Sequence, residues 1–278
     1  MSFGGGRLDG RRGYAGAMDP ARTTHRDVTR REFARQAASV ERAGSLFGAA
    51  DILEWIGAHV PVTAADVVLD VAGGTGQLAR HLARSAAFAV VVDLTAEMLQ
   101  TGARSAHDAG DRNVVFVEGD ATRLPFASEQ FDVVVSRFAL HHVDDVAAAG
   151  REMARVCRPG GAVAIIDLVA QEGEVGARHN ELERLRDPSH ARALEEAELV
   201  AVLADAGVRA AVMAERRQQM PVAAWLDQSA PGEAEREHVR AALEAEAEGG
   251  AATGLNARRD EAGLVIEQRW LIVGGVRP

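Results

Sequence analysis

A glycine-rich turn is the first feature of the chain whose residue types could do chemistry. It follows the apolar run at 67–71 in the sequence Val-Val-Leu-Asp-Val-Ala-Gly-Gly-Thr-Gly, which ends at Gly76. Because glycine lacks a side chain, a ligand can lie directly against the backbone of such a turn at the carboxyl edge of a parallel sheet. The turn therefore predicts a binding loop for a cofactor.

An acidic residue follows at a suitable distance along the chain. Asp93 ends the next β-like run, where a carboxylate can accept hydrogen bonds from both hydroxyls of an adenosine ribose. The segment from Gly74 to Ala79 also fits the relaxed Gly-x-Gly-x-x-Ala fingerprint of dinucleotide enzymes. These two features alone leave open a nicotinamide, a flavin or another adenosine-containing cofactor.

Two adjacent histidines and an aspartate form a second group with chemical potential. His141 and His142 follow the fourth β-like run, and Asp167 ends the fifth. Because the carboxyl ends of parallel strands share one edge of a sheet, we expect the three to converge there. One of them could act as a general base that takes a proton from a bound substrate. Such a base typically raises a reaction rate by about 100- to 10,000-fold. Alternatively, the histidines are hydrogen-bonded structural groups that shape a pocket without titrating.

The elements that must position these residues alternate between short apolar runs and amphipathic stretches. This pattern is typical of βαβ units around a parallel sheet that is buried on both faces. A further helix is predicted at 195–206, and a β-like run with Trp270 as a core anchor closes the chain at 263–276. The five strands are expected at 67–71, 87–93, 114–118, 131–136 and 162–168.

The regions around this core predict three parts. Residues 1–28, rich in glycine and arginine at the start, are expected to be a disordered leader. Residues 29–62 are expected to form a helical flap that begins at the capping box of Thr29 and Glu32. The main domain is then 63–278, with lid segments near 171–194 and 227–260. Arg184 and His190 are the predicted substrate contacts of the first lid, unless that segment is only a solvated helix face.

Composition excludes several classes of function. The 278 residues carry a net charge of -10 and no lysine, which disfavours a nucleic-acid partner. The single cysteine, Cys157, excludes an internal disulfide, and its apolar surroundings predict a small buried residue. We expect no metal site and no membrane insertion, because no apolar run approaches the length of a membrane span. A cytoplasmic location follows from these expectations.

Further motifs separate the cofactor classes. Glu-Gly-Asp-Ala-Thr-Arg-Leu-Pro-Phe stands at 118–126, Phe-Asp-Val-Val-Val-Ser-Arg-Phe-Ala-Leu-His-His at 131–142, and Arg-Pro-Gly-Gly at 158–161. With the glycine loop and Asp93, this series resembles the class I S-adenosylmethionine-dependent methyltransferases. The resemblance is to the small-molecule group that includes ubiquinone and menaquinone C-methyltransferases and natural-product sugar O-methyltransferases.

The resemblance implies a fold and a set of site residues. The fold is α/β, a Rossmann-like doubly wound sheet of about seven strands, mostly parallel with an antiparallel last strand, plus N-terminal helices and a lid insertion. Asp93 would bind the ribose, Asp120 with Ala121 would meet the adenine, and Asp70 would hold the amino group of the methionine part through its surroundings. Gly74 and Gly76 would lie under that part. The complete implied cofactor set is Asp70, Ala72, Gly73, Gly74, Gly76, Asp93, Leu94, Met98, Asp120, Ala121 and Arg137.

Some of these roles have alternatives. Met98 either packs on the adenine or fills the core, and Asp70 could merely pair with backbone groups, although a buried carboxylate is costly without donors. The expected function is methyl transfer from S-adenosylmethionine to an oxygen or carbon of a small-molecule acceptor, in secondary-metabolite or quinone-like biosynthesis. Its catalytic residues would be His141, His142 and Asp167, as the resemblance to sugar O-methyltransferases implies.

Two competing functions stay open at this point. The first is a protein that binds the cofactor but catalyses a cyclisation or rearrangement without methylation, since one fold can host several reactions. The second is a nicotinamide oxidoreductase, against which Asp120 and the Arg-Pro-Gly-Gly motif argue. A homodimer is a possible assembly.

Overall fold

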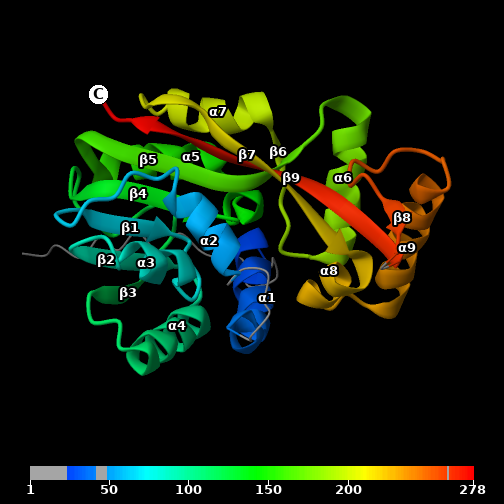
Figure 1. Cartoon of the computed structure of the whole chain (residues 1–278), viewed down its shortest axis with the longest axis horizontal. Helices are drawn as coiled ribbons and strands as arrows, with labels where there is room; N and C mark the ends of the chain where they lie inside the picture. The colour runs from blue at the N-terminus through cyan, green and yellow to red at the C-terminus, as the bar shows by residue number, and fades with distance from the viewer. Residues whose placement is uncertain (1–23, 42–48, 262) are drawn as a thin grey trace, which may run out of the picture.

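A nine-stranded mixed sheet runs through the middle of the computed structural model (Figure 1), which describes residues 24–41, 49–261 and 263–278. The strands are β1 (Val67–Val71), β2 (Phe88–Asp93), β3 (Val114–Glu118), β4 (Phe131–Arg137), β5 (Cys157–Ala170), β6 (Leu194–Glu195), β7 (Arg209–Pro221), β8 (Arg258–Asp260) and β9 (Gly263–Val276). The main order is β3-β2-β1-β4-β5-β9-β7, with β6 beside β5 and β8 beside β9.

The direction of the strands agrees with the expected fold class. Strands β1 to β5 pair in parallel, whereas β9 runs antiparallel to both β5 and β7. The predicted antiparallel last strand is therefore confirmed. From β1 the chain forms β2 and then β3 on one side of β1. It then crosses over and forms β4 and β5 on the other side of β1. The carboxyl ends of β1 and β4 thus lie at the switch point of the sheet, where α/β folds bind ligands.

Two boundaries differ from the sequence expectation. Strand β5 begins at Cys157 rather than at residue 162, because the chain pairs with Phe131 before a register shift in the β4–β5 ladder. Strand β7 was not predicted at all. It is a sheet-edge strand whose segment Glu215 to Gln219 is mostly charged and polar, so it lacks the apolar run that marks a strand buried on both faces.

Helices cover both faces of the sheet. On one face α2 and α3 pack with Val68 and Val91, and on the other α5 and α7 pack with Leu69 and Val90. Consecutive residues of one strand thus pack on opposite faces of the sheet, because side chains alternate between the two faces along a strand. The helices are α1 (His25–Val40), α2 (Ala50–Gly57), α3 (Gln77–Leu82), α4 (Ala96–Ala109), α5 (Val146–Val156), α6 (Gly173–Arg186), α7 (Glu196–Ala204), α8 (Val222–Ser229) and α9 (Glu233–Ala247), with a short 3₁₀ turn at Leu140–His142.

The first described helix begins earlier than the sequence indicated. Helix α1 starts at His25, and Thr29 lies inside it instead of capping it. Its start is stabilised by Thr24 and Asp27, because the amide of each residue bonds to the side chain of the other. An aspartate thus takes the role that the Thr-x-x-Glu pattern assigns to glutamate. Residues 1–23 of the predicted leader lie outside the described residues.

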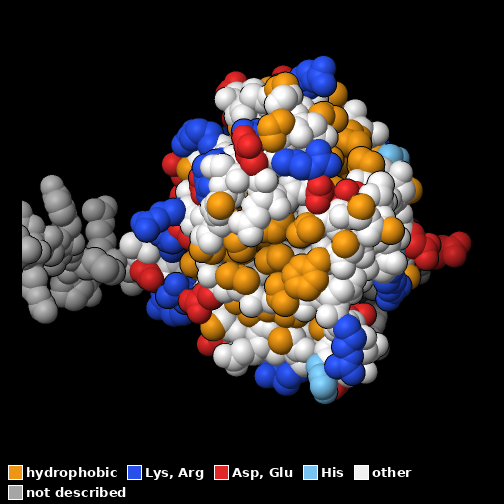
Figure 2. Space-filling model, turned by 90° about the vertical axis from the view of Figure 1, so that its left-hand side faces the viewer, with side chains coloured by type: hydrophobic (Ala, Val, Ile, Leu, Met, Phe, Trp, Pro, Cys, Tyr) orange, Lys and Arg blue, Asp and Glu red, His pale blue; other side chains and the backbone are white. Residues whose placement is uncertain are grey.

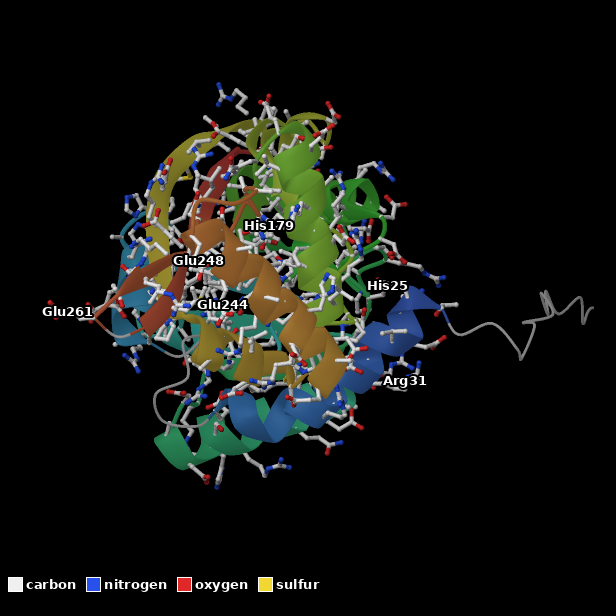
Figure 3. The ribbon with its side chains drawn as sticks, turned by 90° about the vertical axis from the view of Figure 1, so that its right-hand side faces the viewer. His25, Arg31, His179, Glu244, Glu248 and Glu261 are labelled. Carbon is white, nitrogen blue, oxygen red and sulfur yellow. The ribbon has the colours of Figure 1, made fainter. Side chains whose placement is uncertain are left out.

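A third apolar cluster forms under α6, α8 and α9, at the ends of β7 and β9 farthest from the chain terminus. Figure 3 views the molecule from this side, with α6 and α9 in front and α1 beside them. The two predicted lid segments, near 171–194 and 227–260, contribute α6 and α9 to this unit. The opposite end, where the parallel strands begin, presents hydrophobic side chains among charged ones (Figure 2). Among the described helices, none is long and apolar enough to cross a membrane.

Candidate active site

A cavity of about 300 Å³ opens at the carboxyl edge of β1, β2 and β4. Its walls come from the glycine loop after β1, the 3₁₀ turn after β4, and α1, which packs between α4 and α8. Residues near the end of α6, in α8 and in β9 close the far side. Residues from the sheet edge and from α6 and α8 therefore line one cavity.

The glycine loop gives this cavity a floor of bare backbone. Gly74 has a φ of +58°, in the left-handed region that glycine adopts without strain, and Ala72 has a φ of +53°. A Cβ atom on Gly74 would come no closer than 4.0 Å to another atom, the sulfur of Met98, so the backbone is open to the cavity. Gly76 is different, because a Cβ there would lie 2.7 Å from Val91. Gly76 allows the loop to pack on the sheet and does not line the cavity.

Asp93 lines the cavity beside the glycine loop. Its two oxygens accept hydrogen bonds of 2.8 Å from the amides of Gly74 and Thr95. Burial raises the pKa of Asp93, although these amides act in the opposite direction. Each carboxylate oxygen has a second lone pair, so the side chain can still accept further donors. A ligand with two hydroxyls at this point would complete the hydrogen bonding of a buried carboxylate.

Asp70 lies behind the loop and does not line the cavity. Its Oδ2 accepts a hydrogen bond of 3.1 Å from the amide of Ala79, whereas its Oδ1 is buried without a hydrogen-bond partner among the described residues. Burial raises the pKa of Asp70 to about 7, and the charge of Arg137 works against that rise. Arg137 itself lines the cavity and donates to Gln77 at 3.3 Å. The pair places a carboxylate and a guanidinium at the same end of the site.

Asp120 and Met98 border the neighbouring part of the cavity. Asp120 accepts hydrogen bonds of 2.8 Å from the amide and hydroxyl of Thr122 through Oδ1. Its Oδ2 forms an ion pair with Arg26 of α1. The first described helix is thereby held against the loop after β3, over this end of the site.

His141 is held by Asp167 in a buried ion pair. The Nδ1 of His141 lies 2.6 Å from Oδ1 of Asp167, and the other oxygen of Asp167 accepts the amides of Leu140 and His141 at 3.0 and 3.3 Å. Burial opposes a charge on His141, but the Asp167 carboxylate outweighs it and raises the pKa of His141. Asp167 does not line the cavity, so it positions the 3₁₀ turn and its histidine.

His142 has a different environment, which fixes its protonation. Its Nδ1 lies 2.9 Å from the carbonyl oxygen of Ser189, and because a carbonyl oxygen only accepts, Nδ1 carries the hydrogen. The lone pair is then on Nε2, for which the described residues provide no hydrogen-bond partner. Burial, together with the charge on His141 at a ring distance of 4.1 Å, lowers the pKa of His142. His142 is therefore a neutral imidazole with a free lone pair at the cavity.

Most of the residues predicted from the sequence line this one cavity. Five of them do not line it, and three of these five, Asp70, Gly76 and Asp167, lie directly behind the lining residues. Arg184 is exposed and donates to the carbonyl of Ala191 at 3.3 Å, and His190 is buried against Asn180 at 2.8 Å, so neither lines the cavity. The lining residues among those predicted are Ala72, Gly73, Gly74, Asp93, Leu94, Met98, Asp120, Ala121, Arg137, His141 and His142.

Sequence reasoning missed two groups of cavity residues. The first comes from α1, where His25, labelled in Figure 3, places its Nε2 3.1 Å from the carbonyl of His142. The second group comes from α8 and the end of α6 and consists of Arg186, Asp187 and Trp225. The sequence did contain a signal for Arg186, because the spacing of His179, Glu183 and Arg186 places them on one helix face. Charged residues on a helix face normally indicate exposure to solvent, so this signal was not recognised. In the structure all three residues are buried.

Comparison with known proteins identifies the central part of the chain. Residues 69–165 match the family described as "Methyltransferase domain". This part of the chain is therefore similar to methyltransferase domains. The relatives include an uncharacterized methyltransferase, YcgJ of Bacillus subtilis, 40% identical over 45% of this chain and 50% of that protein. A demethylmenaquinone methyltransferase of Mycobacterium marinum is 46% identical over 37% of this chain and 42% of that enzyme. The matches thus span half or less of these curated relatives.

The chain also has structural neighbours that cover nearly its whole length. The crystal structure of YcgJ superposes with a TM-score of 0.75 and 26% identity, over 81% of this chain and 98% of that chain. The [4+2]-cyclase SpnF superposes with a TM-score of 0.61 and 19% identity, over 92% and 98% of the two chains. The second likeness concerns the fold alone. The resemblance to class I methyltransferases that the motifs indicated is confirmed.

The residues of this site fit S-adenosylmethionine. The open backbone at Gly74 leaves room for a ligand, and Asp93 retains lone pairs for ribose hydroxyls. The guanidinium of Arg137 lines the cavity and complements the carboxylate of an amino-acid end, whereas Asp70 lies behind the loop. No rearrangement of the loop is needed to create these groups.

Proposed function

We propose that this protein transfers a methyl group from S-adenosylmethionine to an oxygen or carbon atom of a small-molecule acceptor. The observation that carries the proposal is a single cavity with the glycine loop and Asp93 at one end and the neutral His142 at the other. When bound, S-adenosylmethionine supplies an electrophilic methyl group. The protein then has to hold a nucleophile in line with it and exclude water.

The cofactor would be held by the residues at the sheet edge. Asp93 would accept the ribose hydroxyls, Asp120 and Ala121 would border the adenine, and Arg137 would pair with the carboxylate of the methionine part. Helix α1 would cover the bound molecule, because Arg26 and Phe33 line the cavity above it. Met98 lines the same space beside Gly74, which favours contact with the cofactor over pure core filling.

His142 would act as the general base in this proposal. Its Nδ1–H is fixed on Ser189, so the lone pair on Nε2 can take a proton from the acceptor. His141, paired with Asp167, would position the turn. The two adjacent histidines have different partners, which fits these two roles. The pKa of His141 is raised and favours the charged form, whereas the pKa of His142 is lowered and favours the neutral form.

The acceptor is proposed to belong to quinone-like or secondary metabolism. The support is that one relative is named for demethylmenaquinone, although that match covers only 37% of this chain. We further propose a cytoplasmic protein, which agrees with a buried thiol at Cys157 whose pKa burial raises to about 11. The expectations of a homodimer and of no nucleic-acid partner stay predictions.

The first experiment is a calorimetric titration with S-adenosylmethionine, S-adenosylhomocysteine and nicotinamide dinucleotides. Binding of the first two alone is expected, and binding of a nicotinamide dinucleotide instead would refute the cofactor assignment. Candidate acceptors are then incubated with the protein and S-adenosylmethionine, and the product is weighed by mass spectrometry. A gain of one methyl group supports the proposal. A changed product of unchanged mass would favour the alternative, a cofactor-binding protein that catalyses cyclisation or rearrangement.

A further inference from the structure

The acceptor end of the cavity is unusually aromatic for this chain. The protein has three tryptophans, and two of them, Trp225 and Trp270, line the cavity. Phe138 packs against Trp270 with ring centroids 4.5 Å apart, and Phe33 packs edge-on against His142 at 4.8 Å. Overall aromatic content is only 4%, so tertiary structure concentrates these rings at one place. Such walls fit a planar acceptor.

A buried arginine lies in the same region. The Cζ of Arg186 lies 4.7 Å from the ring centroid of Trp225, and Arg186 lines the cavity although it is only 8% exposed. Its Nε donates to the fully buried Glu183 at 2.9 Å, and its Nη1 donates to the hydroxyl of Ser229 at 2.9 Å. Two of its three nitrogens are therefore fixed, and the guanidinium plane cannot turn freely.

The third nitrogen of Arg186 is available to a ligand. Within the described part of the chain Nη2 has no hydrogen-bond partner, and it is not among the fully buried atoms that lack one. Nη2 is therefore accessible, and because Arg186 lines the cavity we infer that Nη2 faces it. A preorganised N–H donor on a charged group binds an oxygen more strongly than a neutral donor would.

The neighbouring charges define which oxygen suits this donor. Glu183 offsets the charge of Arg186, and Asp187 adds a carboxylate that lines the cavity. The cavity is also lined by the neutral His142 and by His141, which pairs with Asp167 behind it. A ligand with a concentrated double negative charge is disfavoured here. An oxygen whose single charge is spread over a conjugated system, and develops as a proton leaves, is favoured.

We propose that Arg186 determines acceptor specificity by binding an enol or phenol oxygen of a planar acceptor and stabilising its charge as the proton leaves. This inference rests on the proposed function. The acceptor's proton passes to Nε2 of His142, and the conjugated oxygen or the carbon next to it forms the bond to the methyl carbon. The carbon–sulfur bond breaks, and its electron pair stays on sulfur. Arg186 thus discriminates enols and phenols from acceptors without such an oxygen.

The test compares two probes of the same bicyclic shape. The first is 2-hydroxy-1,4-naphthoquinone, which carries an enolate oxygen at neutral pH, and the second is 2-methyl-1,4-naphthoquinone, which does not. Both are titrated up to about 10 mM, with and without S-adenosylhomocysteine, by isothermal calorimetry. We expect wild type to bind the hydroxy probe at least about tenfold more tightly than the methyl probe, as for a hydrogen bond to a charged group.

Three variants test whether Arg186 causes the preference for the hydroxy probe. Arg186→Met should remove the preference for the hydroxy probe and leave the affinities for the methyl probe and S-adenosylhomocysteine unchanged. Arg184→Met is the matched control, because this exposed arginine two residues earlier does not line the cavity, and it should keep the full preference. Should Arg186→Met fail to fold because the buried Glu183 has lost its arginine partner, the double variant Glu183→Gln/Arg186→Met removes both charges.

The outcomes separate this inference from the proposed function. A preference that survives in Arg186→Met or in the double variant overturns the role of Arg186. So does a wild type that binds the two probes equally or binds neither. If S-adenosylhomocysteine itself does not bind, the proposed function fails, whereas the preference measured without it still decides on Arg186.

Discussion

The Nδ1 atom of His142 lies 2.9 Å from the carbonyl oxygen of Ser189, a contact that joins the turn after β4 to the segment after α6. Residues 47 positions apart in the sequence thus set one tautomer. The hydroxyl of the same serine donates to Asp187 at 2.5 Å, which holds the serine in place. The site depends on this link, because it turns the lone pair of His142 away from the lid segment.

A first prediction concerns the loss of this imidazole. His142→Ala should lower kcat by about 100- to 10,000-fold, because the acceptor loses its base, and should leave the Kd for S-adenosylmethionine within about twofold. Single-turnover kinetics and calorimetry measure the two quantities. A variant with full kcat would show that His142 only shapes the pocket.

The pH dependence of the wild type follows from the same residue. The folded environment lowers the pKa of His142 below the ordinary value of 6.5, so the neutral base persists as pH falls through 6.5. The kcat should therefore stay level between about pH 8 and pH 6.5 and decline only at more acidic pH. A midpoint at or above 6.5 in the kcat profile would contradict this assignment.

A second prediction tests the cofactor end. Asp93→Ala removes the acceptor of the Gly74 and Thr95 amides and of the proposed ribose hydroxyls, so the affinity for S-adenosylhomocysteine should fall by more than about tenfold. Asp108→Ala, an exposed carboxylate of α4, is the control and should bind normally. Undiminished affinity in Asp93→Ala would place the ribose elsewhere.

A third prediction links the His141–Asp167 pair to stability. The pKa of His141 is raised in the folded protein, so the stabilisation from protonating it is fully present below pH 6.5 and is lost as pH rises through the folded-state value. Asp167→Asn should therefore lower Tm more at about pH 6 than at about pH 9. The part due to the amides of Leu140 and His141 should be independent of pH. A pH-independent loss would mean that His141 is neutral throughout.

A fourth prediction sets helix propensity against packing. In α4, Gly102→Ala should gain about 1 kcal/mol from propensity, but the new Cβ would lie 2.4 Å from the carbonyl oxygen of Thr75. Overpacking costs about 1–3 kcal/mol, so the net change is destabilising. Because Thr75 belongs to the glycine loop, binding of S-adenosylhomocysteine should weaken too. Ala103→Gly, on the exposed face of the same helix, should lower Tm without changing binding.

The sequence by itself indicated strands β1 to β5 and β9, together with the glycine loop and Asp93. The runs at 67–71 and 114–118 coincide with β1 and β3, because their β-branched and other apolar residues favour strands. The glycine loop is a local motif, and Asp93 accepts a hydrogen bond from Gly74 only 19 positions earlier, at the end of the neighbouring strand. Patterns of short range are readable without coordinates.

Only the tertiary structure decided the acceptor end. Arg186, Trp225 and Trp270 come from α6, α8 and β9, and no spacing along the chain indicates that they meet. The same holds for the protonation of His142, which depends on Ser189, and for Arg26, which reaches Asp120 from α1. Contacts between distant segments carry no periodic signal, and the charged residues of α6 suggest solvent until the third apolar cluster is seen to bury them. Burial, rather than residue type, therefore separates Arg186 from Arg184.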